Sequence, residues 1–179
     1  MPRSGFIWRH VIVSTHNAWL PGDARGWRSR DHRLHLSGDY RNPPPKREHA
    51  GLRRYARSIN GPPVAVPCSV RPIIGARLLQ SLHEHDVRVL VIAVAGMHAH
   101  ALAELPEDRS AAGAIVGQAK NFASRNVRRL MPGTIWAAGG FFKPVRDRAH
   151  QRNVFRYIRD QQGDGAWVWT FREPIPVIE

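Results

Sequence analysis

The stretch Val89–Leu105, VLVIAVAGMHAHALAEL, decides the fold class expected for this chain. Together with the two residues before it, it begins with the run Val87–Val94, apolar except for Arg88, which is typical of a buried strand. Gly96 offers a turn, and residues 99–105 then predict the paired antiparallel strand. Residues i and i+2 of a strand point to the same face, so His98 and His100 are expected to project together.

The segments on either side predict an alternation of helices and strands. In chain order, the expected elements are a strand over 6–15, a helix over 70–85, strands over 87–94 and 99–105, a helix over 110–130, a strand or hairpin over 134–145, a helix over 148–162 and an apolar strand or packing segment over 165–174. This order is the split βαβ pattern. The expected fold class is therefore α+β: a ferredoxin-like antiparallel sheet with helices on one face, plus a C-terminal helix bearing Tyr157.

The composition indicates a soluble protein with a polyanionic partner. The chain has 179 residues and a formal net charge of +13, and a surplus of that size most often marks a nucleic-acid-binding protein. Cys68 is the single cysteine, which excludes an internal disulfide and fits a reducing cytoplasm. No apolar run is long enough for a signal peptide or a membrane span, so no membrane partner is expected.

A basic, loop-rich segment over 19–63 follows the first strand. It is rich in Gly, Pro and Arg, and residues 1–60 hold 12 Lys and Arg against 4 Asp and Glu. A short helix is expected over 48–58. The segment has too few apolar residues for a core of its own. We therefore expect one domain over 1–179 with a basic insertion at 19–63.

The histidine pair is a candidate metal site. Two imidazoles at this spacing bind one divalent metal when a third ligand comes from elsewhere. The alternative is a pair of partly exposed histidines at a strand end, because a bare His-x-His is weakly specific and the chain has 10 histidines. By the same i+2 parity, Glu104 shares this face and is a minor candidate ligand.

The helix expected over 148–162 carries a polar stripe beside its apolar one. Asn153, Tyr157 and Gln161 are spaced i, i+4, i+8 and so share one face, with His150 near its start. Of the three tyrosines in the chain, only Tyr157 lies on a well-formed amphipathic helix that the fold order can lay against the sheet.

In this order, the motifs MHAHALAEL, GTIWAAGGFFKPVRD and NVFRYIRDQ resemble the single-tyrosine HUH transposases, which include the REP-associated tyrosine transposases and their insertion-sequence relatives. The early segment NAWLPGDARGW also resembles that group, and the resemblance covers about residues 6–171. Alanine stands between the two histidines, where the family often has Val or Ile.

The resemblance implies a division of labour among the candidate residues. His98, His100 and Gln161 would be metal ligands, and Tyr157 would attack a backbone phosphate of single-stranded DNA to form a covalent phosphotyrosine. Mg²⁺ or Mn²⁺ suits such a mixed ligand set. The resemblance further implies hairpin-forming DNA as substrate, a homodimer, and a cytoplasmic, nucleoid-associated location in a bacterium.

Cations along the helix over 110–130 predict a track for DNA phosphates, because no acid occurs from Gly117 to Arg129 and charge balancing along the helix is absent. A second basic patch is expected on the short helix of the insertion. The expected nucleic-acid-binding residues are Lys120, Arg125, Arg128, Arg129, Arg53 and Arg54. Trp19, Trp27 and Trp136 are candidates for stacking on unpaired bases, and each is equally well a core residue.

Two other functions stay open at the level of the sequence. One is a non-catalytic nucleic-acid-binding module of ferredoxin-like fold, derived from such a transposase. The other is a metal-dependent hydrolase of small phosphoesters, which would need neither the +13 charge nor a lone tyrosine. The approach of Tyr157 to the histidine pair, within one chain or across a dimer, distinguishes the catalytic hypothesis from the others.

Overall fold

The computed structural model describes residues 1–23, 27–28, 35–36 and 49–176. Its contacts divide the chain into two compact units. Met1–Thr15 and Ala65–Glu179 form the first, here called the sheet unit, and His16–Val64 form the second, the insertion unit. The basic segment expected at 19–63 thus coincides with the insertion unit to within three residues at one end and one at the other.

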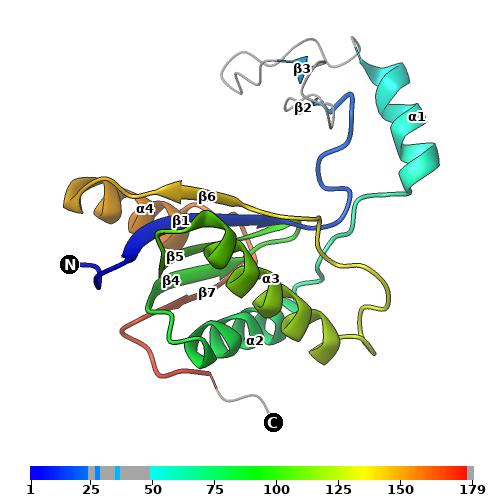
Figure 1. Cartoon of the computed structure of the whole chain (residues 1–179). Coiled ribbons are helices and arrows are strands. Elements are labelled where there is room, and N and C mark those ends of the chain that lie inside the picture. The colour runs from blue at the N-terminus through cyan, green and yellow to red at the C-terminus, as the bar shows by residue number, and fades with distance from the viewer. Residues whose placement is uncertain (24–26, 29–34, 37–48, 177–179) are drawn as a thin grey trace. The chain divides into compact units, whose positions relative to one another are not determined.

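The sheet unit is built on five antiparallel strands, so the α+β class expected from the sequence is confirmed (Figure 1). The strand order is β6-β1-β5-β4-β7. The strands are β1 (Phe6–Ser14), β4 (Val89–Val94), β5 (His98–Pro106), β6 (Phe141–Pro144) and β7 (Trp167–Thr170). Strands β1 and β5, of nine residues each, pair along their full length in a register that sets Ile12 opposite His100.

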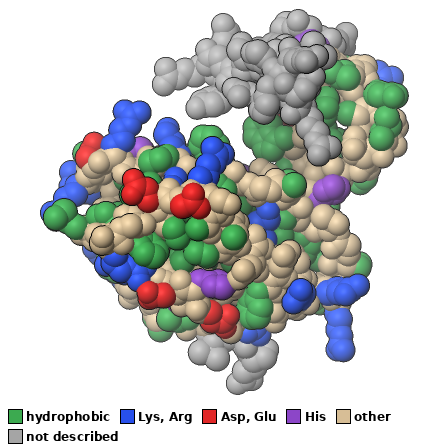
Figure 2. Space-filling model, in the orientation of Figure 1, with side chains coloured by type: hydrophobic (Ala, Val, Ile, Leu, Met, Phe, Trp, Pro, Cys, Tyr) green, Lys and Arg blue, Asp and Glu red, His purple; other side chains and the backbone are tan. Residues whose placement is uncertain are grey.

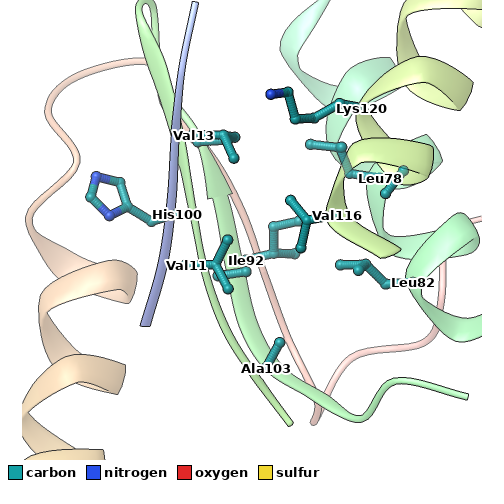
Figure 3. Close-up of a pocket in the computed structure, with 12 residues that line it drawn as sticks. Val11, Val13, Leu78, Leu82, Ile92, His100, Ala103, Val116 and Lys120 are labelled. Carbon is teal, nitrogen blue, oxygen red and sulfur yellow. The ribbon is translucent and has the colours of Figure 1, made fainter. Parts of the chain in front are cut away.

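Helices α2 (Arg71–Glu84) and α3 (Arg109–Asn126) pack together on one face of this sheet. The core there joins Ile74 and Leu79 of α2 to Val116 of α3 and to Ile92 of the sheet. Each such fully buried aliphatic side chain contributes roughly 1.5–3 kcal/mol relative to an exposed one. Figure 3 shows Val116, Leu78 and Leu82 directed from the two helices towards the sheet.

Helix α4 (Arg148–Asp160) covers part of the opposite face, so the helices do not all share one side. Val154 and Ile158 are buried against Val91 of β4 and Leu102 of β5. The helix begins where the sequence predicted, because the carboxylate of Asp147 accepts a hydrogen bond from the backbone N–H of His150 at 2.8 Å. This packing fixes which side of α4 faces the sheet.

Helix α3 ends at Asn126, four residues before the end expected from the sequence. The side-chain amide of Asn126 donates to the carbonyl of Phe122 at 2.9 Å, a local bond of the kind that competes with helix continuation. Residues 127–130 form turns instead. Arg128 and Arg129 consequently lie beyond the helix on which the sequence placed them.

The insertion unit contains one helix and one short strand pair among its described residues. Helix α1 (Ala50–Asn60) is the helix expected over 48–58, and β2 (Trp27–Arg28) pairs antiparallel with β3 (His35–Leu36). Gly22 has a positive φ of 84°, and a Cβ there would come within 2.5 Å of the Arg53 backbone nitrogen, so only glycine fits. Among the described residues, no helix has the length and apolar content needed to cross a membrane.

Candidate functional site

The histidine pair lies on the face of the sheet that α4 covers. In β5, Ala99 and Ala101 belong to the core under α2 and α3, so His98 and His100 project to the other side, as the i+2 parity predicted. Figure 3 shows His100 directed towards α4, away from Val11 and Val13 on the opposite face. The two imidazole centroids are 4.8 Å apart and nearly perpendicular.

A third histidine, His10 of β1, completes the cluster. Its Nε2 lies 2.9 Å from Nδ1 of His100, so one of these nitrogens donates a hydrogen bond to the other. The β1–β5 register causes this contact: Ile12 is opposite His100, which makes His10 the diagonal neighbour on the same face. His10 was not among the residues predicted from the sequence. The available signal was a polar residue inside the β-branched run of the first strand.

Tyr157, on α4, lies next to the histidine cluster. Its ring centroid lies 5.6 Å from that of His100 and 5.9 Å from that of His10, with an edge-on orientation to both. Val154, three residues before Tyr157, and Ile158, one residue after it, are buried and hold α4 on the sheet, which turns Tyr157 towards the imidazoles. The side chain is still 39% exposed, which leaves it open to a large substrate. The tyrosine and the histidines come from one chain.

Burial keeps the imidazoles of His100 and His10 neutral near pH 7. Burial, together with repulsion from the neighbouring His98 and His10, lowers the pKa of His100 to about 3. Burial also lowers the pKa of His10 to about 4, with added repulsion from Lys143 and His150. Neutral imidazole has a free lone pair, which is the form that ligates a metal.

Two imidazoles and one amide make up the ligand set expected from the sequence. Gln161 is the C-cap residue of α4, one turn beyond Tyr157, and its side chain is exposed. Among the described residues, no three His, Cys, Asp or Glu side chains are grouped so as to hold a metal ion. The ligand set expected from the sequence contains only two residues of these four types, His98 and His100, because its third member is Gln161. Because His10 engages Nδ1 of His100, the Nε2 atom of His100 is the one left for a metal.

Glu104 shares the strand face of the histidines but has a different role. Its carboxylate is fully buried and accepts from Nε of Arg3 at 2.8 Å and from Nε of Arg88 at 2.6 Å. The hydrogen bond from Arg88 is the main cause that lowers the pKa of Glu104 to about 2. The two hydrogen bonds from the Nε atoms share Oε2, and Oε1 accepts from the backbone N–H of Arg3 at 2.6 Å and from the guanidinium of Arg88. Both carboxylate oxygens are therefore occupied, and Glu104 anchors the N-terminal segment to β5.

The cations expected to form a phosphate track along α3 differ in burial: one is buried and the others are exposed. Lys120 is buried, and its ammonium donates to the carbonyls of Ala137 and Gly139 at 2.7 Å each. Its charge therefore holds the segment before β6 in place and is not presented to solvent, contrary to the expectation. Arg125 and Arg128 line one shallow surface hollow with Asn121, Ser124 and Gly133.

The remaining expected cations are exposed. Arg129 lies in the turn after α3, on the α2–α3 side of the sheet and not on the side of Tyr157. In the insertion unit, Arg53 and Arg54 are exposed on α1, and Arg53 lies 3.9 Å from the carboxylate of Asp23. Figure 2 shows Lys and Arg side chains projecting at several places on the visible face of the molecule.

The three tryptophans considered for base stacking differ in exposure. Trp136 is buried and forms an isolated bridge with Thr15, so it belongs to the core of the sheet unit. Trp19 is 53% exposed in the insertion unit. The side chain of Trp27 lies outside the described residues.

Comparison of the chain with protein-family models, with curated proteins and with solved structures finds no match in any of the three.

Proposed function

We propose that this protein nicks and rejoins single-stranded DNA through a covalent 5′-phosphotyrosine on Tyr157, with the help of a divalent metal. The observation that carries the proposal is the position of Tyr157, whose ring lies within 6 Å of two imidazoles of its own chain, centroid to centroid. The approach of the tyrosine to the histidine pair was the condition for the catalytic hypothesis. The net charge of +13 supports a nucleic-acid substrate.

The arrangement of elements supports the ferredoxin-like fold that the resemblance to single-tyrosine HUH transposases implies. The strands and helices β1, α2, β4, β5, α3 and β6 follow the split βαβ order, with both helices on one face. In this proposal α4 is the tyrosine-bearing helix of the family, and β7 extends the sheet beyond β4.

The proposed reaction conserves the energy of the phosphodiester. The phenol oxygen of Tyr157 attacks phosphorus, a Tyr–O–P bond forms, and the bond from phosphorus to the 3′ oxygen breaks. The phenol proton passes to water, and the departing 3′ oxygen takes up a proton. Attack of a 3′-hydroxyl on the phosphotyrosine reverses these steps, so rejoining needs no ATP.

His98, His100 and the amide of Gln161 would hold the metal, with Mg²⁺ or Mn²⁺ as the suited ions. When bound there, the ion would neutralise phosphate charge and polarise the P–O bond. The lowered pKa of His100 favours its neutral, ligating form. Gln161 is exposed, so no packing occupies its amide.

His10 acts as a positioning residue in this proposal. When Nδ1–H of His100 donates to Nε2 of His10, Nε2 of His100 keeps its lone pair and can ligate a metal. The opposite tautomer of the pair would place a proton on Nε2 of His100 and block it. A homodimer, hairpin-forming DNA as substrate and a location near the bacterial nucleoid, all implied by the resemblance, stay predictions.

A nicking assay tests the proposal. The full chain is mixed with end-labelled single-stranded hairpin oligonucleotides of varied sequence and Mn²⁺, and the products are separated under denaturing conditions. We expect a protein–DNA adduct that requires metal and disappears in Tyr157→Phe. Tyr55→Phe is the matched control, because Tyr55 is an exposed tyrosine of the insertion unit and should leave the adduct intact.

The assay also separates the competing functions. Hairpin binding without an adduct, across the whole oligonucleotide library, would instead indicate the non-catalytic nucleic-acid-binding module. Release of phosphate from small phosphoesters that persists in Tyr157→Phe would indicate the metal-dependent hydrolase. An adduct that survives in Tyr157→Phe would place the nucleophile elsewhere.

A further inference from the structure

A groove with a basic and aromatic lining runs beside α4, on the side away from Tyr157. We call it the α4–β7 groove. It is a hollow of about 290 Å³ lined by Leu90, Gln151, Arg152, Phe155, Arg156, Arg159, Phe171 and Arg172. We propose that the α4–β7 groove binds a segment of single-stranded nucleic acid, with arginines on the phosphates and phenylalanines against the bases.

The charge of the groove fits a phosphate backbone. Four of its eight lining residues are arginines and none is acidic. Arg159 is paired with Asp160 at 2.6 Å, whereas Arg152, Arg156 and Arg172 have no ion pair with any described residue. Guanidinium groups bind phosphate oxygens in a bidentate fashion, and a row of unpaired ones is a favourable track for a polyanion.

The aromatic residues provide a platform for unpaired bases. The rings of Phe155 and Phe171 are 6.3 Å apart, centroid to centroid, and Phe171 is 51% exposed. Arginine side chains already lie over these rings, Arg172 at 5.6 Å from the centroid of Phe171 and Arg159 at 5.7 Å from that of Phe155. Alternating aromatic and guanidinium planes are typical of surfaces that stack single-stranded bases without reading their sequence.

The groove is held in a defined shape by the sheet. The backbone N–H of Phe171 donates to the carbonyl of Leu90 at 3.0 Å, which extends the β4–β7 pairing by one residue. The hydroxyl of Thr170 then donates to the carboxylate of Glu173 at 2.8 Å and closes the turn after β7. These bonds fix the backbone at Phe171, so little conformational entropy is lost when a base stacks on its ring.

The position of the groove connects it to the tyrosine site. Phe155 and Arg159 are two residues before and after Tyr157, which places them about 200° around the helix from it at 100° per residue. Both sites thus open on the same face of the sheet, on opposite sides of one helix. The cations of α3, by contrast, are on the other face. This inference deepens the proposed function by locating the bound strand, but binding in the groove requires neither metal nor Tyr157.

Fluorescence anisotropy tests the proposal with the full chain and a labelled oligothymidylate, in EDTA so that no nicking occurs. We expect Arg152→Gln/Arg156→Gln to raise Kd at least tenfold and to reduce the slope of log Kd against log salt by about 1.4, because each lost phosphate contact on a single strand accounts for about 0.7. Phe171→Leu should raise Kd about fivefold or more with the slope unchanged, because stacking is not electrostatic. With an abasic oligonucleotide, Phe171→Leu should have no effect.

Arg109→Gln is the control, since it removes an exposed cation at the start of α3, on the other face of the sheet. It should change Kd less than twofold. Wild-type affinity in either groove variant would overturn the proposal, as would a loss of duplex binding equal to the loss of single-strand binding. Failure of the nicking assay leaves this result unchanged. Groove variants that still form the Tyr157 adduct at saturating DNA would leave the proposed function standing even if the groove proposal fails.

Discussion

Nε2 of His10 and Nδ1 of His100 lie 2.9 Å apart, although the two residues are separated by 90 positions in the chain. Each side chain is at least nine-tenths buried. A buried hydrogen bond between two imidazoles orients both rings and links the tautomer of one to that of the other. The consequences for metal binding and for acid stability are open to measurement.

Removing the partner of His100 should weaken metal binding. In His10→Ala, the ring of His100 loses the acceptor that fixes its orientation, and we expect the Kd for Mn²⁺ to rise about 10- to 100-fold, the range typical of residues that orient a metal ligand. Titration calorimetry measures the Kd. His10→Gln should recover part of the affinity, because an amide oxygen also accepts. His85→Ala, an exposed histidine after α2, is the control, and an equal loss there would contradict the prediction.

The metal-free protein should lose stability as pH falls from about 6.5 towards 4. His10 and His100 have folded pKa values of about 4 and about 3, below the ordinary 6.5, so the unfolded chain binds more protons in this window. Their contribution to stability is complete well above pH 6.5, and below it declines by up to about 1.4 kcal/mol per pH unit for each histidine, or about 2.7 for both. Urea unfolding at pH 7, 5.5 and 4.5 in EDTA measures the decline. His100→Asn should flatten it, and an unchanged pH dependence in that variant would exclude the pair as its cause.

Neutralising Glu104 should destabilise the sheet unit. Glu104→Gln leaves Arg3 and Arg88 without the buried carboxylate that both contact, and we expect the free energy of unfolding to fall by about 2 kcal/mol. The arginines are partly exposed, so water offsets some of the loss. Asp86→Asn is the matched control: it removes only the exposed partner of Arg3 and should cost less than about 1 kcal/mol. Chemical denaturation of both variants distinguishes the buried from the exposed pair.

Glycines in the two helices of the core should respond in opposite directions to alanine. A Cβ at Gly75 of α2 would lie 2.0 Å from ring atoms of Trp167, so Gly75→Ala should cost about 1–3 kcal/mol through overpacking. At Gly113 and Gly117 of α3 a Cβ meets nothing within 4 Å, so alanine there should stabilise by about 0.5–1 kcal/mol through helix propensity. Thermal unfolding measures both, and stabilisation by Gly75→Ala would mean that the Trp167 ring can move aside.

The order of elements and most of their bounds were predictable because they depend on local patterns. The apolar run and the turn at Gly96 predicted the β4–β5 hairpin, and the helix expected from residue 148 begins there, after its N-cap Asp147. Alternation along β5 placed His98 and His100 on one face, as the structure has them. The end of α3 was predicted wrongly, because the side chain of Asn126 bonds to the backbone one turn earlier.

By itself, the sequence determined the class of fold, the shared face of the two histidines and the amphipathic helix that carries Tyr157, since strand parity and helical period are properties of neighbouring residues. Only the tertiary structure decided which distant groups meet. The register of β1 against β5 places His10 next to His100. The packing of Val154 and Ile158 against the sheet directs Tyr157 towards both histidines. Hydrogen bonds to two backbone carbonyls hold the ammonium of Lys120 in the interior. These contacts depend on how separate elements pack, which no local pattern specifies.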